Sequence, residues 1–121
     1  MDDSSNRRRY PRANVDEDHT VRFHLGDKAY TGLVMTNLSA GGCCIKVPAE
    51  EAEGMAKGTL VHTMYLVHPR IPSTPLQASI SWLLGRQPGR NEGVVLVGLE
   101  FVDLNPYFQA TLERYVQEIL G

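Results

Sequence analysis

Short segments in which apolar and polar residues alternate, separated by breaks rich in glycine and proline, run through most of the chain. In residues 20–25, Val21 and Phe23 alternate with polar neighbours, which is the period-two pattern of a half-buried strand. Gly26-Asp27 then provides a tight connection to the next segment, as expected for a hairpin. Residues 48–58 form an acidic connection with room for one helical turn. We predict six strands, over residues 20–25, 28–39, 43–47, 59–67, 76–84 and 93–102.

The last segment of the chain has the periodicity of a helix. Asn105 is a good N-cap and Pro106 suits the first helical position, so the predicted helix spans 105–120. Its apolar face should pack across the barrel or against a partner. Six short antiparallel strands and one helix predict an all-β fold, a closed β-barrel with a C-terminal helix. The apolar face of the helix consists of Phe108, Leu112, Tyr115, Val116 and Ile119.

Four arginines lie within six residues near the N-terminus, around the pair Tyr10-Pro11. An Arg guanidinium can bond O6 and N7 of a guanine bidentately, pair with a phosphate, or stack on a base. The proline pushes the residue before it toward an extended conformation. Arg8 and Arg12 therefore start about 13 Å apart, at roughly 3.3 Å per residue, and their side chains can converge on one compact anion. The four arginines are Arg7, Arg8, Arg9 and Arg12.

A second polar cluster follows at the end of the second predicted strand. Asn37 and Ser39 are two residues apart, so their side chains are expected on the same face of the strand, about 6.6 Å apart. An amide oxygen and a hydroxyl at this spacing can accept from the N1–H and N2–H₂ donors of a guanine. Gly41 and Gly42 come next, and the missing Cβ lets a backbone approach a ligand closely.

Taken together, the Arg-x-x-x-Arg spacing of Arg8 and Arg12 and the Asn-x-Ser-x-x-Gly spacing from Asn37 to Gly42 resemble the motifs of the PilZ family. Residues 98–101 (Gly-Leu-Glu-Phe) also resemble the last strand of that family. The resemblance implies a PilZ-like β-barrel that binds the bacterial second messenger cyclic di-GMP. The family usually has Asp where this chain has Asn37, which keeps an acceptor and loses the charge. The ligand-binding residues implied by this resemblance are Arg7, Arg8, Arg9, Arg12, Asn37, Ser39, Gly41, Gly42 and Trp82.

Trp82 is the single tryptophan of the chain. A tryptophan at the end of a strand is more often part of the core, because it can bury a large apolar area. Some PilZ domains place an aromatic residue at a similar position to stack on a guanine, and Trp82 resembles it.

Residues 1–15 are expected to form a flexible N-terminal arm that carries the arginines, and residues 16–121 the barrel domain. The predicted function is a receptor that changes conformation when cyclic di-GMP binds and signals to a downstream protein. The alternative is a PilZ-like adaptor that acts through protein contacts without binding nucleotide. The sequence does not decide whether the protein is a monomer or a dimer.

The charge distribution argues against a third function, the binding of DNA or RNA. From position 13 onward the chain has eight basic and twelve acidic residues, so the barrel domain is acidic and the positive charge is concentrated near the N-terminus. A general DNA or RNA binder needs a wide basic face. The distribution instead favours a small anionic ligand at one place.

Signatures of other functions are missing from the sequence. It has no nucleophile elbow, phosphate loop or zinc-protease motif, so we expect no enzymatic activity. His62 and His68 would be about 20 Å apart on one strand, and His19 and His24 lack ligand-like spacing, so we expect no metal and no cofactor. No signal peptide or membrane span is predicted, and Cys43 is expected to be a small core residue in a cytoplasmic protein.

Overall fold

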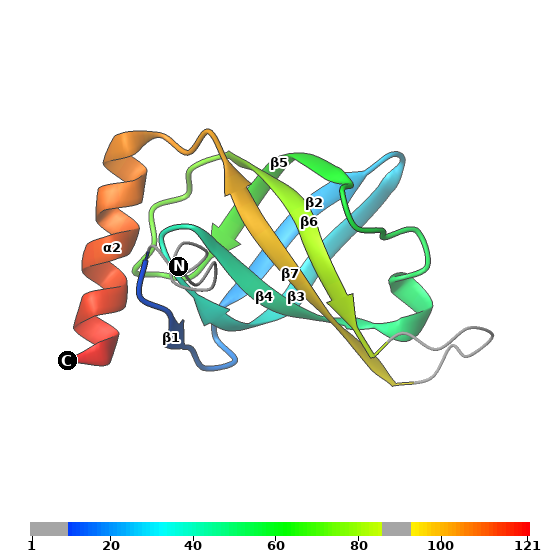
Figure 1. Ribbon diagram of the computed structural model, residues 1–121, viewed down its shortest axis with the longest axis horizontal. Helices are drawn as coiled ribbons and strands as arrows, with labels where there is room; N and C mark the ends of the chain where they lie inside the picture. Colours follow the sequence, from blue (N-terminus) through cyan, green and yellow to red (C-terminus); the bar gives the residue numbers. More distant parts are fainter. Residues whose placement is uncertain (1–9, 86–92) are drawn as a thin grey trace, which may run out of the picture.

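Six long antiparallel strands close into a barrel in the computed structural model, which describes residues 10–85 and 93–121. The strand order is β1-β3-β2-β5-β6-β7-β4, and an additional pairing of β3 with β4 closes the sheet on itself (Figure 1). Closure leaves no open edge along the barrel. The predicted fold is confirmed, and β1 adds a two-residue pairing outside the six long strands. The strands are β1 (Ala13–Asn14), β2 (Thr20–Leu25), β3 (Lys28–Leu38), β4 (Gly42–Pro48), β5 (Leu60–Val67), β6 (Leu76–Leu84) and β7 (Val94–Val102).

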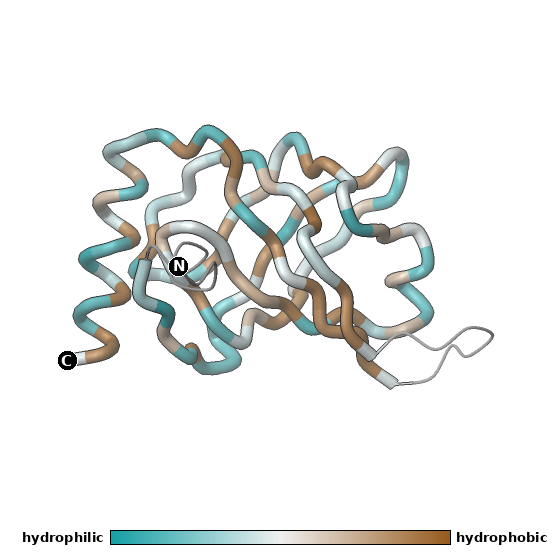
Figure 2. Tube along the Cα trace, in the orientation of Figure 1, coloured by the Kyte–Doolittle hydropathy of each residue, from teal (hydrophilic) through white to brown (hydrophobic). Residues whose placement is uncertain are grey.

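The alternation of side chains places one face of each strand in the core. Figure 2 shows the corresponding change between hydrophobic and hydrophilic residues along the chain. Val21 and Phe23 are buried as predicted. The richness of residues 59–67 in Val, Leu, Thr and Tyr predicts a largely buried strand, and this prediction is wrong. In β5, Val61, Met64 and Leu66 are buried and Leu60 and Thr63 are exposed, and the register against β6 shifts between Val61 and Met64. Only the inner face of a single-layered barrel packs on the core. In the acidic connection, η1 (Ala49–Glu51) is the expected helical turn.

One predicted face of the second long strand is wrong. Strict alternation along residues 28–39 predicts Asn37 on the same face as Met35, with Leu38 on the other face. In the structure the register of β3 against β4 shifts between Met35 and Asn37, and both Met35 and Leu38 are buried. A bulge adds one residue to a strand and exchanges the faces beyond it. Local alternation could not reveal this shift.

The C-terminal helix α2 (Pro106–Leu120) lies at one end of the barrel, beside β1 (Figure 1). Asn105 caps it as predicted, because its side chain accepts from the N–H groups of Tyr107 and Phe108 at 2.8 and 3.3 Å. The predicted apolar face is confirmed except for its last member, since Ile119 is 38% exposed. The buried residues of the helix are Phe108, Leu112, Tyr115 and Val116. No helix among the described residues is long and apolar enough to span a bilayer.

A buried histidine attaches the helix to the barrel. His19 Nδ1 lies 3.0 Å from Asp16 Oδ1, and His19 Nε2 lies 2.6 Å from the hydroxyl of Tyr115 on α2. An ionised carboxylate only accepts, so Nδ1–H donates to Asp16, and in the neutral ring Nε2 accepts from Tyr115 O–H. Burial raises the pKa of Tyr115, which keeps this donor protonated. The ring of His68 stacks on His19 with centroids 3.9 Å apart.

Asp16, His19 and His68 therefore bring three potential metal-ligand atoms within 4.8 Å of one another. Sequence spacing did not indicate this group, because the two histidines meet only through the pairing of β2 with β5, where Thr20 lies opposite Val67. Both ring nitrogens of His19 are already in hydrogen bonds. We interpret the group as a structural network, which we call the histidine bridge.

The histidine bridge predicts that stability falls with pH below about 6.5. The pKa of His68 is lowered from its ordinary value of 6.5, first by burial and then by the nearby His19. The unfolded chain therefore takes up protons before the folded chain does, so stability present above pH 6.5 is lost as the pH falls through the lowered pKa of His68. Urea unfolding at pH 7.5 and pH 5.5 should show a lower free energy of unfolding at pH 5.5.

His68→Gln cannot take up this proton, so it should flatten the difference between the two pH values. His24→Gln, at an exposed position of β2, is the matched control and should leave the difference unchanged. The pKa of Asp16 is also lowered, by its hydrogen bond to His19, but from an ordinary value of 3.8, so its contribution is lost in a separate, more acidic range. An equal pH dependence in His68→Gln and the unmodified protein would contradict the assignment.

Candidate functional site

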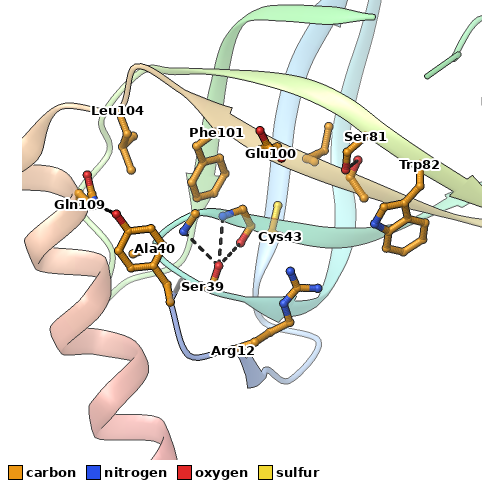
Figure 3. Close-up of a pocket in the computed structure, with 15 residues that line it drawn as sticks. Arg12, Ser39, Ala40, Cys43, Ser81, Trp82, Glu100, Phe101, Leu104 and Gln109 are labelled. Atoms are coloured by element: carbon orange, nitrogen blue, oxygen red, sulfur yellow. Dashed lines mark hydrogen bonds between the residues drawn. The ribbon is translucent and has the colours of Figure 1, made fainter. Parts of the chain in front are cut away.

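A cavity of about 350 Å³ lies between the N-terminal segment, the β3–β4 turn, the outer side of β6 and β7, and the start of α2. We call it the arm pocket. Figure 3 shows side chains from each of these elements around it. Residues far apart in the sequence therefore meet here, among them Arg12 of the first motif and Ser39 and Gly42 of the second. Its polar and aromatic lining residues are Tyr10, Arg12, Ser39, Ser81, Trp82, Glu100, Phe101 and Gln109.

Arg12 enters the pocket because β1 fixes the residues that follow it. Ala13 and Asn14 pair antiparallel with Leu38 and Asn37, so the preceding residue lies beside the turn that ends β3. Arg12 is exposed, and it forms no ion pair with any residue that the structure describes. Its guanidinium is thus available to an anionic ligand. Arg7, Arg8 and Arg9, the other predicted members of the arm, lie outside the described residues.

Ser39 lines the pocket but also holds the turn together. Its hydroxyl oxygen accepts from the N–H groups of Gly41 and Gly42 at 3.0 and 3.2 Å, and its own N–H donates to the Gly42 carbonyl at 2.9 Å. Ser39 is buried. These bonds give it a structural role in the turn, and a direct contact with a guanine stays a prediction.

The two glycines are required by the packing of the protein itself. A Cβ on Gly42 would overlap the carbonyl oxygen of Leu99 on β7, and a Cβ on Gly41 would lie 3.0 Å from the ring of Tyr10. The missing side chains let β4 approach β7 and let Tyr10 pack on the turn. Both glycines line the arm pocket. The close approach of a ligand to their backbone stays a prediction.

Asn37 does not line the arm pocket. The bulge in β3 changes the direction of this position, and Asn37 lies between Asn14 of β1 and Cys44 of β4. Its Oδ1 is buried and has no hydrogen-bond partner among the described residues. Of the two acceptors predicted for a guanine edge, the structure brings only Ser39 into the pocket.

Trp82 lies on the outside of the barrel rather than in the core. It is 38% exposed, and a Cβ on Gly98 of β7 would overlap its indole ring. The ring therefore lies over the bare backbone of Gly98. Both residues line the arm pocket. An aromatic face in such a place can stack on a nucleobase.

Sequence reasoning did not assign Tyr10, Gln109 or Glu100 to the site, and all three line the pocket. The hydroxyl of Tyr10 accepts a hydrogen bond from the side-chain amide of Gln109 on α2, which ties the N-terminal segment to the helix. Glu100 is exposed on the outer face of β7. Only Glu100 had a sequence signal, because it lies in the predicted last strand at a position that faces away from the core.

The cysteine at the pocket wall is not a nucleophile. Burial, together with the neighbouring Cys44, raises the pKa of Cys43 from 9.0 to about 12. The thiol therefore stays protonated near neutral pH. Cys43 is buried, as predicted for a small core residue.

Comparison with known proteins agrees with this geometry. The family model of the PilZ domain matches residues 6–118. The chain belongs to the PilZ family. No curated protein matches the sequence.

Solved structures show the same fold at low sequence identity. The complex of MrkH from K. pneumonia with c-di-GMP has a TM-score of 0.77 and 16% identity, covering 93% of this chain and 52% of MrkH. The PilZ domain of YcgR from Escherichia coli with c-di-GMP has a TM-score of 0.75 and 17% identity, covering 94% and 92%. The inhibitor of motility MotI/DgrA from Bacillus subtilis has a TM-score of 0.68 and 17% identity, covering 92% and 50%. The chain thus spans about half the length of MrkH and of MotI/DgrA.

The contact of Trp82 with Gly98 predicts that Gly98→Ala displaces the indole from the barrel surface. Because Trp82 is the only tryptophan, its fluorescence reports this directly. The emission maximum should shift to longer wavelength as the ring becomes more exposed to water. Gly54→Ala is the matched control, since a Cβ there meets nothing within 4 Å. An unchanged spectrum in a folded Gly98→Ala protein would contradict the contact.

Proposed function

We propose that the protein is a cytoplasmic receptor for cyclic di-GMP. The observation that carries this proposal is the meeting of Arg12 and Trp82 in one cavity beside the Asn-x-Ser-x-x-Gly turn. A guanidinium suits a phosphate or the O6 and N7 edge of a guanine, and an indole suits the face of the base. The similar structures of MrkH and YcgR are complexes with c-di-GMP, which supports the same ligand here.

The size and chemistry of the arm pocket fit one part of such a ligand. Its volume of about 350 Å³ lies at the lower end of ordinary ligand pockets. Arg12 would hold a guanine edge or a phosphate. Arg8 would act as its partner, and Arg7 and Arg9 would add phosphate contacts from outside the described residues.

The pocket supports binding rather than hydrolysis. Hydrolysis of a phosphodiester normally uses a metal-activated water, which requires several carboxylate or imidazole ligands. Among the described lining residues there is one carboxylate and no histidine. We therefore propose that the protein detects the messenger and leaves it intact.

Tyr10 offers a route by which binding could reach a downstream protein. It packs on Gly41 in the turn, lines the ligand pocket, and bonds to Gln109 on α2. A ligand that orders the arm also acts on Tyr10, and Tyr10 contacts the helix. The outer side of α2 would then present a changed surface to a partner, which is an order–disorder type of switch.

Arg12→Ala tests the binding site. Loss of a charged hydrogen bond should cost about 1.5–3 kcal/mol, or roughly ten- to hundredfold in affinity for cyclic di-GMP. Calorimetric titration measures this loss. Arg22→Ala is the matched control, because Arg22 is exposed on β2 and lies over the ring of Tyr65, outside the pocket.

Competition with GTP and with single-stranded RNA extends the same experiment. Binding of cyclic di-GMP that neither competitor displaces supports the receptor. Absence of any binding by the unmodified protein would favour the adaptor that acts through protein contacts alone. Equal affinity of Arg12→Ala and the unmodified protein would refute the assigned role of Arg12.

Tyr10→Phe tests the route to the helix. The change removes only the hydroxyl that accepts from Gln109, so affinity should stay within about tenfold, as for one neutral hydrogen bond. Hydrogen exchange of the α2 amides should change on addition of ligand to the unmodified protein and change much less in Tyr10→Phe. Tyr107→Phe, at an 85% exposed position of the same helix, is the control. An undiminished response in Tyr10→Phe would exclude this route.

A further inference from the structure

Glu100 is a carboxylate in a pocket that otherwise suits an anion. Among the described lining residues of the arm pocket it is the only acidic side chain. It forms neither an ion pair nor a hydrogen bond with any described residue that would neutralise it. A free negative charge near bound phosphates weakens binding unless the ligand presents donors to it.

The position of Glu100 places it beside the stacking surface. On β7 it lies two residues beyond Gly98, the residue that the Trp82 indole covers. Positions two apart point to the same side of a strand and are about 6.6 Å apart. Glu100 also lies opposite Gly42 of β4, which has no side chain to cover it. A base stacked on Trp82 thus has its edge within reach of Glu100.

The charged side chains Arg12 and Glu100 lie on different walls of the arm pocket. Arg12 comes from the N-terminal segment, whereas Glu100 comes from β7 with Trp82 on the neighbouring strand β6 (Figure 3). A base between them can offer one edge to each. The O6 and N7 acceptors of a guanine suit Arg12, and its Watson–Crick edge then faces away from Arg12.

The acceptors predicted from the sequence are not free for that Watson–Crick edge. Asn37 lies outside the pocket lining, and the hydroxyl of Ser39 is bonded to the backbone of its own turn. The amide of Gln109 donates to Tyr10. Glu100 is the remaining side chain with two free acceptor oxygens.

We infer that Glu100 accepts the N1–H and N2–H₂ donors of a guanine and makes the pocket selective for guanine over adenine. Two parallel donors match the two oxygens of a carboxylate. Adenine has an acceptor at N1 and only a C–H at C2, so at these two positions it offers no donor to either carboxylate oxygen of Glu100. This inference rests on the proposed function and adds the group that recognises the base.

Calorimetric titration with three cyclic dinucleotides tests the inference. Cyclic di-GMP has both donors, cyclic di-IMP lacks the N2 amino group, and cyclic di-AMP lacks both donors. The unmodified protein should bind cyclic di-IMP roughly tenfold more weakly than cyclic di-GMP, as for one lost charge-assisted hydrogen bond, and cyclic di-AMP more weakly still. In Glu100→Ala the preference for cyclic di-GMP over cyclic di-IMP should fall to about one, because the acceptor of the amino group is gone.

Glu100→Gln keeps the shape of the side chain and removes the charge, and it should weaken binding of cyclic di-GMP about tenfold or more. Glu53→Gln is the matched control, since Glu53 is exposed and lines a different depression. Tighter or unchanged binding of cyclic di-GMP by Glu100→Gln would overturn the inference and leave the receptor function standing. Equal affinity of the unmodified protein for the three dinucleotides would also overturn it, without use of any variant. Failure of the unmodified protein to bind cyclic di-GMP would overturn the proposed function and this inference together.

Discussion

Two backbone-paired residues, Ala13 and Asn14, hold the candidate site together. Their pairing with Leu38 and Asn37 fixes the path of the chain as it reaches the barrel, and so places Arg12 beside the β3–β4 turn. Backbone hydrogen bonds achieve this without using the guanidinium. A fully free arm would spend much of its binding free energy on becoming ordered. Anchoring at β1 reduces that cost for the residue nearest to the barrel.

The floor of the site is a stretch of bare backbone on the outside of the barrel. Gly42 of β4 and Gly98 of β7 carry no side chain at outward positions, and the indole of Trp82 occupies the space where a Cβ on Gly98 would lie. Barrel closure puts β4, β7 and β6 side by side, so three strands contribute to one surface. Arg12 and Glu100 then lie at its borders. The surface therefore combines an aromatic face with charges of both signs, which suits a base better than a phosphate alone.

Two polar bridges join the C-terminal helix to the rest of the molecule. Tyr10 and Gln109 connect it to the N-terminal segment at the arm pocket, and His19 and Tyr115 connect it to the barrel. The first contact lies at the arm pocket, and the second joins two buried side chains. The helix is thus attached by polar contacts at both of these places, while its apolar face keeps it on the barrel.

Local patterns predicted the strands, the helix and the cap at Asn105, because alternation and capping depend on residues only a few positions apart. It also indicated that Arg12 and the turn after β3 belong to one site. Only the tertiary structure removed Asn37 from that site, because the bulge in β3 arises from its pairing with β4. Likewise, the contacts of Tyr10 and His19 with α2 join positions 99 and 96 residues apart. Which distant residues meet is decided by strand order and barrel closure, and a local pattern does not contain that information.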